Sequence, residues 1–237
     1  MIPLRDANPT RRTPVVTLAL IAACTAVFAL ELSVEASGGE AALAAFFDTW
    51  GAVPSRISAA LDGTGDIGPA ATGVLASLFL HGGWEHLIGN MLFLWIFGNN
   101  IEDRLGRLPF VGFYLLGGIV AALAQVWIEP ASDIPLVGAS GAIAATLGAY
   151  IVLYPRARIL TFVFLGFFFQ LIEVPALIVL ALWFGLQLID GVATLGAPTA
   201  GGGVAFFAHI GGFAMGALVG LAVRSLARRP PRTPGWP

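Results

Sequence analysis

The chain alternates long apolar runs with short polar segments that carry arginine and proline. A helix needs about 20 apolar residues to cross roughly 30 Å of hydrocarbon. Six runs fit this length: 14–34, 84–103, 108–128, 136–155, 170–190 and 204–224. They lack the strict apolar–polar alternation of strands in a membrane barrel. The pattern predicts an all-α polytopic membrane protein with a bundle of six transmembrane helices, the core of which spans residues 14–224.

The connection between the first two runs is long. Weakly polar sequence begins at Ala70, but one helix from there to Arg104 would measure about 50 Å, too long for one crossing. The segment His81-Gly82-Gly83 is a natural break. We therefore expect a long first loop over about 35–83, lying against the membrane, and a second span that starts at Trp84.

The ends of the chain are short and polar. Residues 1–13 form a short N-terminal segment, and residues 225–237 form a basic, proline-rich tail. The first apolar run follows basic residues, as a signal peptide would. It is long for such a peptide and has no clean cleavage motif, so we interpret it as an uncleaved span.

The composition supports a membrane location. Hydrophobic residues make up 57% of the chain and charged residues 11%, against about 25% charged residues in soluble domains. The mean hydropathy is +0.86. The single cysteine, Cys24, lies inside an apolar run, which excludes a disulfide framework and a thiolate metal cluster. Basic clusters with interleaved aromatic residues are absent from the sequence, so we expect no nucleic-acid partner. We also expect no cofactor.

The arginines predict the orientation. All 12 basic residues are arginine. With six spans and an inner N-terminus, only Arg56 falls outside. The other eleven fall on the inner side: Arg5, Arg11, Arg12, Arg104, Arg107, Arg156, Arg158, Arg224, Arg228, Arg229 and Arg232. This asymmetry follows the positive-inside rule, so both termini are predicted to be cytoplasmic.

Polar residues recur near the start of three predicted spans. His86, Ser140 and His209 each lie within the first turns of a helix that runs from outside to inside. At 1.5 Å per residue, all three lie within roughly 10 Å of the outer boundary. Asn90 follows His86 by four residues and shares its helix face. Polar groups at membrane depth are costly without partners, so their agreement in depth favours a functional site.

The serine stands in a glycine-rich setting. Gly138 and Gly141 flank Ser140 and let other chain segments approach it closely. The motif is G-A-S-G and differs from the G-x-S-x-G elbow of α/β-hydrolases. In the last span, Gly212 and Gly216 lie on one face, one turn and two turns after His209. This GxxxG face can pack against the small residues of span four and bring His209 to Ser140.

The four polar residues form an inventory for acyl transfer. Ser140 is a candidate nucleophile and His209 a candidate base, and His86 and Asn90 are candidate donors to an oxyanion. A zinc site built on the histidines is the weaker interpretation, because it leaves Ser140 and its glycines unexplained. A histidine-lined transporter path predicts polar residues along a whole pore, whereas the inner halves of spans four and six are almost purely apolar.

Three segments together resemble the rhomboid family of intramembrane serine proteases. They are HGGWEHLIGNMLFLWIFGN, GASGAIAATLGAY and AHIGGFAMGALVG, in the family's order and spacing. The resemblance implies a six-span rhomboid-like core with a Ser140–His209 dyad and no acidic third member. It also implies an oxyanion hole formed by His86, Asn90 and the Ser140 backbone N–H.

The resemblance extends to the surroundings of the site. It implies that span five is a mobile helix beside the substrate entrance and that residues 191–203 form a cap over the site. One position departs from the family: many members carry an aromatic residue four positions after the serine, stacked on the histidine, and this chain has Ala144. The departure leaves open how the His209 ring is oriented.

The expected partners are membrane lipids and single-span membrane proteins, cleaved near the outer end of their transmembrane segments. A non-catalytic relative that only binds such segments is the alternative, but it would need neither Ser140 nor His209. The compact six-span form suggests a bacterial inner membrane. The substrate and the oligomeric state stay open.

Overall fold

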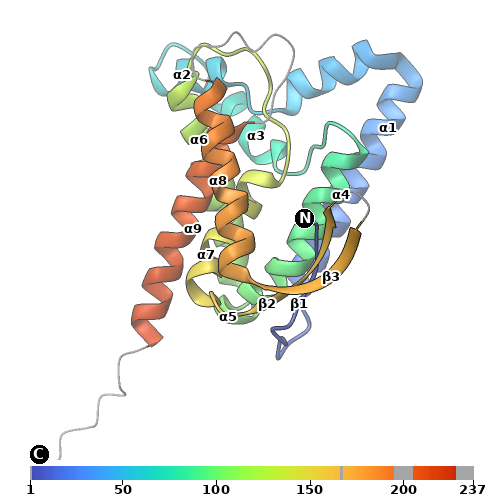
Figure 1. Cartoon of the computed structure of the whole chain (residues 1–237). Coiled ribbons are helices and arrows are strands. Elements are labelled where there is room, and N and C mark those ends of the chain that lie inside the picture. Colours follow the sequence, from blue (N-terminus) through green and yellow to red (C-terminus); the bar gives the residue numbers. More distant parts are fainter. Residues whose placement is uncertain (1, 166–167, 195–204, 228–237) are drawn as a thin grey trace, which may run out of the picture.

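A computed structural model describes residues 2–165, 168–194 and 205–227. The chain is mostly helical (Figure 1). Within these described ranges, four helices are long and apolar enough to cross a membrane: α1 (Val15–Trp50), α6 (Arg107–Ile128), α8 (Ala176–Thr194) and α9 (Phe206–Ala227). The protein is therefore a multi-pass membrane protein, as the sequence predicted.

The other two predicted spans coincide with shorter helices. The second is a continuous helical stretch of three parts: α4 (Trp84–Phe93), the π-helical turn η1 (Leu94–Gly98) and α5 (Asn99–Leu105). The fourth is α7 (Ser140–Leu153). The predicted start at Trp84 is correct, because Gly83 takes a φ of 154° and ends the preceding loop there. It stays a prediction that these two elements also cross the membrane, which would give six crossings in total.

Helix α7 lies at the centre of the bundle. All ten residues from Gly141 to Tyr150 are buried. Helices α6 and α9 pack on it through small residues. A side chain at Gly148 or Gly216 would collide with the backbone of the facing helix. Close approach of backbones is the usual way in which helices associate in lipid, where burial of apolar surface provides no driving force.

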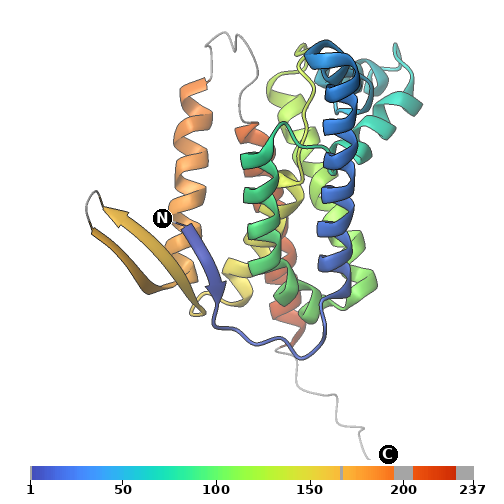
Figure 2. The same ribbon diagram turned by 90° about the vertical axis from the view of Figure 1, so that its right-hand side faces the viewer.

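The predicted all-α class is wrong in one region. Three antiparallel strands form a sheet in the order β1-β2-β3: β1 (Ile2–Asp6), β2 (Arg158–Leu165) and β3 (Phe168–Pro175). Strand β1 lies in the predicted N-terminal segment. Strand β3 takes residues that were assigned to span five, so α8 begins only at Ala176. Figure 2 shows the sheet beside the helices at one end of the bundle.

The error has a physical cause. Residues 158–175 are rich in aromatic and β-branched residues, and a short apolar run does not distinguish a strand from a helix. Pro175 has no N–H to donate and favours the start of a helix over its interior. The strand assignment is decided by pairing between segments far apart in sequence, since Asp6 lies opposite Ile159.

The predicted loop over 35–83 is also largely helical. Helix α1 continues to Trp50 across a break at Gly39, which has a φ of 70° and non-helical geometry. Two short helices follow, α2 (Pro54–Leu61) and α3 (Ile67–Ser77). Residues 40–50 are rich in alanine and phenylalanine, and their helix turns away from the bundle axis after Gly39 (Figure 1). The glycine break, not a loop, ends the straight part of α1.

Polar side chains fasten the end of the bundle that lies opposite the starts of α4, α7 and α9. Glu102 is buried and accepts hydrogen bonds from the backbone N–H groups of Val16 and Thr17 and from the Thr17 hydroxyl. It caps helix α1, which has no capping side chain of its own. Nearby, Tyr150 and Asn100 donate to Asp6, and burial raises the pKa of that carboxyl above its ordinary value.

Candidate active site

Three helices begin at the same end of the bundle, which we call the site end. Ser140 is the first residue of α7, His86 is the third of α4 and His209 is the fourth of α9. The helices run alongside one another in both views (Figures 1 and 2). The three helix starts thus lie at one end of the bundle, and their depth in the membrane stays a prediction.

Ser140 and His209 are hydrogen-bonded. The distance from Ser140 Oγ to His209 Nε2 is 2.7 Å. His209 is buried, with 8% of its surface exposed, whereas Ser140 is half-buried. Because Ser140 is the first residue of α7, it belongs to the helix turn whose free N–H groups carry partial positive charge.

The second nitrogen of His209 also has a partner. Its Nδ1 lies 2.6 Å from Oε1 of Gln187 on α8. An amide oxygen only accepts, so Nδ1 carries the ring proton and Nε2 is left free to accept the proton of Ser140. The indole ring of Trp183, one turn earlier on α8, lies 5.9 Å from the imidazole ring at 39°.

Neither Gln187 nor Trp183 was predicted from the sequence to belong to the site. The signal was present, because Gln187 is the only polar side chain in the run from Ala176 to Ile189. The two residues also account for the departure at Ala144. That alanine is fully buried and faces Gly212, and the aromatic neighbour of His209 comes instead from α8.

His86 and Ser140 both lie beside Gly138. A Cβ placed on Gly138 would lie 2.7 Å from His86 Nε2 and 3.5 Å from Ser140 Oγ, and the φ of Gly138 is 129°. Only glycine combines that backbone geometry with that space. Gly138 thus lies in the loop before α7 rather than in a helix contact. The N–H of Gly82 donates to His86 Nδ1 at 3.4 Å, which leaves Nε2–H as a donor on the side of Gly138.

Asn90 supplies a second donor on the same helix. It is buried, with 8% exposed, and lies one turn after His86. Within the part of the chain that the structure describes, its Nδ2 group has no hydrogen-bond partner. Buried donors in folded proteins nearly always have a partner, so an amide left free at such a position points to a ligand atom or a reacting atom.

The predicted packing glycines hold the helices together beneath the serine. A Cβ on Gly212 would collide with the carbonyl oxygen of Gly141, and one on Gly216 with that of Ala145. Gly141 itself faces Ala121 of α6, at 2.5 Å from an added Cβ. Gly212 and Gly216 therefore allow α9 to approach α7 closely enough for the His209–Ser140 hydrogen bond.

His81 supports the loop that leads into α4. It is buried, and its ring lies 5.2 Å from the ring of His86. Its backbone N–H donates to Glu31 of α1, and its Nδ1 lies 3.1 Å from the Phe79 carbonyl oxygen. Burial and the neighbouring His86 lower the pKa of His81 to about 4, so it is neutral at neutral pH.

Comparison with known families agrees with this geometry. A rhomboid domain is recognised over residues 69–226, which is more than half of the chain and contains Ser140, His209, His86 and Asn90. The chain belongs to the rhomboid family. The predicted membership is thus confirmed. The matched region includes the starts of α4, α7 and α9, where the candidate site lies.

Similar proteins occur in a yeast, a mammal and a plant. Rhomboid protein 1, mitochondrial, of Saccharomyces cerevisiae is 32% identical over 62% of this chain and 40% of its own length. The presenilin-associated rhomboid-like protein, mitochondrial, of Bos taurus is 34% identical over 40% of this chain and 26% of its own. RHOMBOID-like protein 4 of Arabidopsis thaliana is 32% identical over 63% of this chain and 33% of its own. The matched part thus spans 40% or less of these relatives.

Proposed function

We propose that this rhomboid is an intramembrane serine endopeptidase that cleaves transmembrane segments of single-span membrane proteins. The observation that carries the proposal is the 2.7 Å contact between Ser140 Oγ and His209 Nε2 at a helix N-terminus. Family membership supports it, since the matched region contains both residues.

The mechanism follows from the hydrogen bonds. Ser140 Oγ attacks the scissile carbonyl carbon while His209 Nε2 takes the hydroxyl proton. The carbonyl oxygen becomes an oxyanion, and His86 Nε2–H, Asn90 Nδ2–H and the Ser140 backbone N–H stabilise it. His209 then gives its proton to the leaving amine. A water molecule, deprotonated by His209, hydrolyses the acyl-enzyme and restores Ser140.

The shallow position of the site determines the class of substrate. Hydrolysis needs water, and a site near the outer boundary can receive it. A helical substrate has its backbone carbonyls already hydrogen-bonded, so it must unwind locally before attack. We therefore expect cleavage near the outer end of a transmembrane segment, at helix-breaking sequences with small side chains. Neighbouring lipids and such segments are the proposed partners.

Entry past α8 fits this proposal. In Figure 2, α8 stands at the edge of the bundle. Only Ala176, Leu180 and Gly191 of this helix are fully buried. A loosely packed helix beside the site would let a substrate helix approach from the lipid. The cap expected over residues 191–203 falls almost entirely outside the described residues. We also propose that the protein lies in a bacterial inner membrane with both termini in the cytoplasm.

A labelled single-span substrate in liposomes tests the proposal. Wild-type protein is expected to cleave it, and Ser140→Ala and His209→Ala are expected to abolish cleavage. Ser225→Ala, an exposed serine at the far end of α9, is the matched control and should cleave normally. A chelator should have no effect.

The outcomes separate the alternatives. Cleavage that survives Ser140→Ala would refute the assignment of the nucleophile. Absence of cleavage, together with absence of Ser140 labelling by a fluorophosphonate probe, would favour a non-catalytic protein that only binds transmembrane segments.

A further inference from the structure

Helix α8 is attached to the bundle at the site itself. Phe184 stacks on Phe213 of α9 with ring centroids 4.2 Å apart, and Trp183 lies against both His209 and Phe213. Gln187 adds the 2.6 Å hydrogen bond to His209 Nδ1. Part of the contact that holds α8 against the bundle therefore surrounds the imidazole ring.

We infer that Gln187 is a positioning residue for His209, and this inference rests on the proposed protease function. The Gln187 carbonyl oxygen holds the proton on Nδ1, so that Nε2 faces Ser140 Oγ as an acceptor. Without this acceptor, the ring is free to take the other tautomer, in which Nε2 carries a hydrogen and cannot accept the serine proton. The site is then a Ser–His–Gln series, with a neutral amide in place of an acidic third member.

The amide also couples α8 to catalysis. Ser140 and His209 lie on the closely packed helices α7 and α9, whereas Gln187 lies on a helix with few buried residues. Displacement of α8 removes the Nδ1 acceptor and the Trp183 ring together. His209 is then aligned only while α8 is seated against α9.

Two variants test the role of Gln187. Gln187→Leu keeps the side-chain size but removes the acceptor, and we expect turnover to fall on the order of 100-fold, as misaligned catalytic groups typically cause. Gln187→Glu restores an acceptor with a negative charge, which favours the imidazolium. Its activity should recover at alkaline pH, with the acidic limb of the pH–rate profile moved upward by about one unit. His86 on α4 also faces His209 and is unchanged in every variant.

Leu186→Ala is the matched control, because Leu186 precedes Gln187 and is exposed to lipid. It should leave rate and profile unchanged. Full activity in Gln187→Leu, or an unmoved acidic limb in Gln187→Glu, would overturn the positioning role.

A second readout is independent of cleavage. In ¹⁵N-histidine NMR the signal of His209 is the one lost in His209→Gln, and we expect the Nδ1–H tautomer in wild type and a mixture in Gln187→Leu. If the wild type cleaves nothing but its tautomer differs from that of Gln187→Leu in this way, the proposed function fails and the role of the hydrogen bond stands. The same tautomer in both forms would refute the inference itself.

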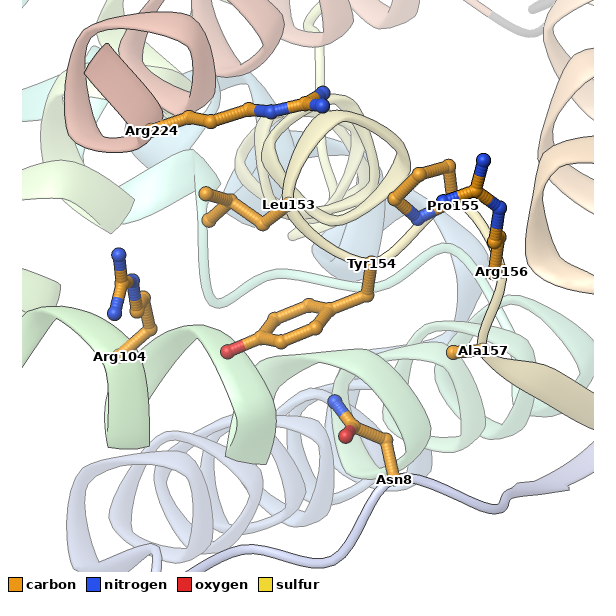
Figure 3. Close-up of a pocket in the computed structure, with 8 residues that line it drawn as sticks. All are labelled: Asn8, Arg104, Leu153, Tyr154, Pro155, Arg156, Ala157 and Arg224. Atoms are coloured by element: carbon orange, nitrogen blue, oxygen red, sulfur yellow. The ribbon is translucent and has the colours of Figure 1, made fainter. Parts of the chain in front are cut away.

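The opposite end of the bundle holds a cavity of about 530 Å³ that carries a second, independent inference. Figure 3 shows three arginines around Leu153 and Tyr154. They come from three different elements: Arg104 from the end of α5, Arg156 from the turn after α7 and Arg224 from the last turns of α9. Separate segments of the chain thus direct positive charge to one hollow.

Within the described residues, the charge of this arginine cavity is not neutralised by ion pairs. Neither aspartate nor glutamate lines it, and within the described residues none of the three arginines forms an ion pair. Arg224 Nη1 donates to the Val152 carbonyl oxygen at 3.4 Å. The C-terminus of α7 contributes a partial negative charge of about one half, which three full positive charges outweigh.

The geometry points to the phosphate of an anionic phospholipid as the ligand of the arginine cavity. Guanidinium groups bind phosphate oxygens in pairs. The cavity lies where the apolar helices α7 and α9 end, so a lipid headgroup can enter while its chains stay along the helices. Leu153 and Pro155 provide an apolar wall. Basic hollows between helix ends are known to bind acidic headgroups.

Native mass spectrometry of the full chain tests this inference. The detergent-purified protein is mixed with phosphatidylglycerol, with phosphatidylcholine or with inorganic phosphate. We expect phosphatidylglycerol to be retained preferentially, and retention to fall about fivefold in Arg156→Gln and again in Arg224→Gln. Arg107→Gln is the control, an exposed arginine at the same end that does not line the cavity.

Three results would overturn it. Equal retention of the two lipids would show that the protein does not distinguish lipids by headgroup charge. An equal loss in Arg107→Gln would show a diffuse surface effect. Binding of inorganic phosphate that displaces the lipid completely would show a site for a soluble anion.

Discussion

At the scale of single residues, the site depends on the backbone conformation of one glycine and on one polar side chain without a hydrogen-bond partner. Gly138 has a φ of 129° and leaves room for the His86 ring beside Ser140. Asn90 keeps a free donor within the described part of the chain. The first feature brings the His86 ring beside the loop that carries the serine, and the second leaves a donor free one turn further along α4.

Replacing Gly138 by alanine is expected to remove most of the activity and little of the fold. The added Cβ would meet His86 Nε2 at 2.7 Å, and a residue with a Cβ disfavours this φ. Displacement of one oxyanion donor typically costs about 100- to 1,000-fold in turnover. Cleavage rate in liposomes measures the effect.

Gly89→Ala is the control, because Gly89 lies in α4 with nothing within 4 Å of an added Cβ. It should cleave as wild type does. If Gly138→Ala also kept its full rate, His86 would have no part in the reaction.

At the scale of elements, the distance between α7 and α9 decides whether the site exists. Both helices present backbone rather than side chains at their contact, since Gly212 faces Gly141 and Gly216 faces Ala145. The His209–Ser140 hydrogen bond spans the same contact. A wider separation of the helices would therefore break the bond without any change to its two residues.

Gly216→Ala should destabilise the protein and lower its activity together. Its Cβ would collide with the Ala145 carbonyl oxygen, and overpacking of this kind typically costs about 1–3 kcal/mol. Thermal unfolding in detergent and the cleavage rate are the measurements. Gly112→Ala, in an open position on α6, should change neither. An unaltered unfolding temperature in Gly216→Ala would argue against the close helix contact.

At the scale of the whole molecule, the two ends of the bundle differ in chemistry. The site end holds the three histidines, whereas the other end holds the β-sheet, the Glu102 cap and the arginine cavity. Apart from Arg56 on α2, the arginines of the described residues lie at the end away from the site, and such an asymmetry is typical of the cytoplasmic face. The charge distribution thus predicts that the active site opens to the outside.

Cysteine labelling in intact cells checks this orientation. In a Cys24→Ser background, a cysteine at exposed Glu85 should react with a membrane-impermeant maleimide, and one at exposed Leu108 should react only after permeabilisation. Cys24 is fully buried, so its replacement by serine is tested first for normal expression. The reverse labelling pattern would invert the proposed topology.

Much of this protein was predictable from its sequence. Apolar runs, arginine asymmetry and the G-A-S-G segment identified a helical membrane protein and its candidate residues, because hydrophobic length and helix period are local properties. The long helices α1, α6 and α9 begin within two residues of their predicted starts. The start of α4 at Trp84 was predicted for the same reason, since Gly83 breaks the helix locally.

Only the tertiary structure decided the rest. Strands β1 and β2 pair across more than 150 residues, and the sequence of either strand alone does not specify its partner. Gln187 was one polar residue in an apolar helix until folding placed it 2.6 Å from His209. The sequence by itself determined which chemical groups are present and at what depth. Their contacts, and hence the tautomer that His209 adopts, depend on how separate helices pack, because a hydrogen bond requires both partners at one point in space.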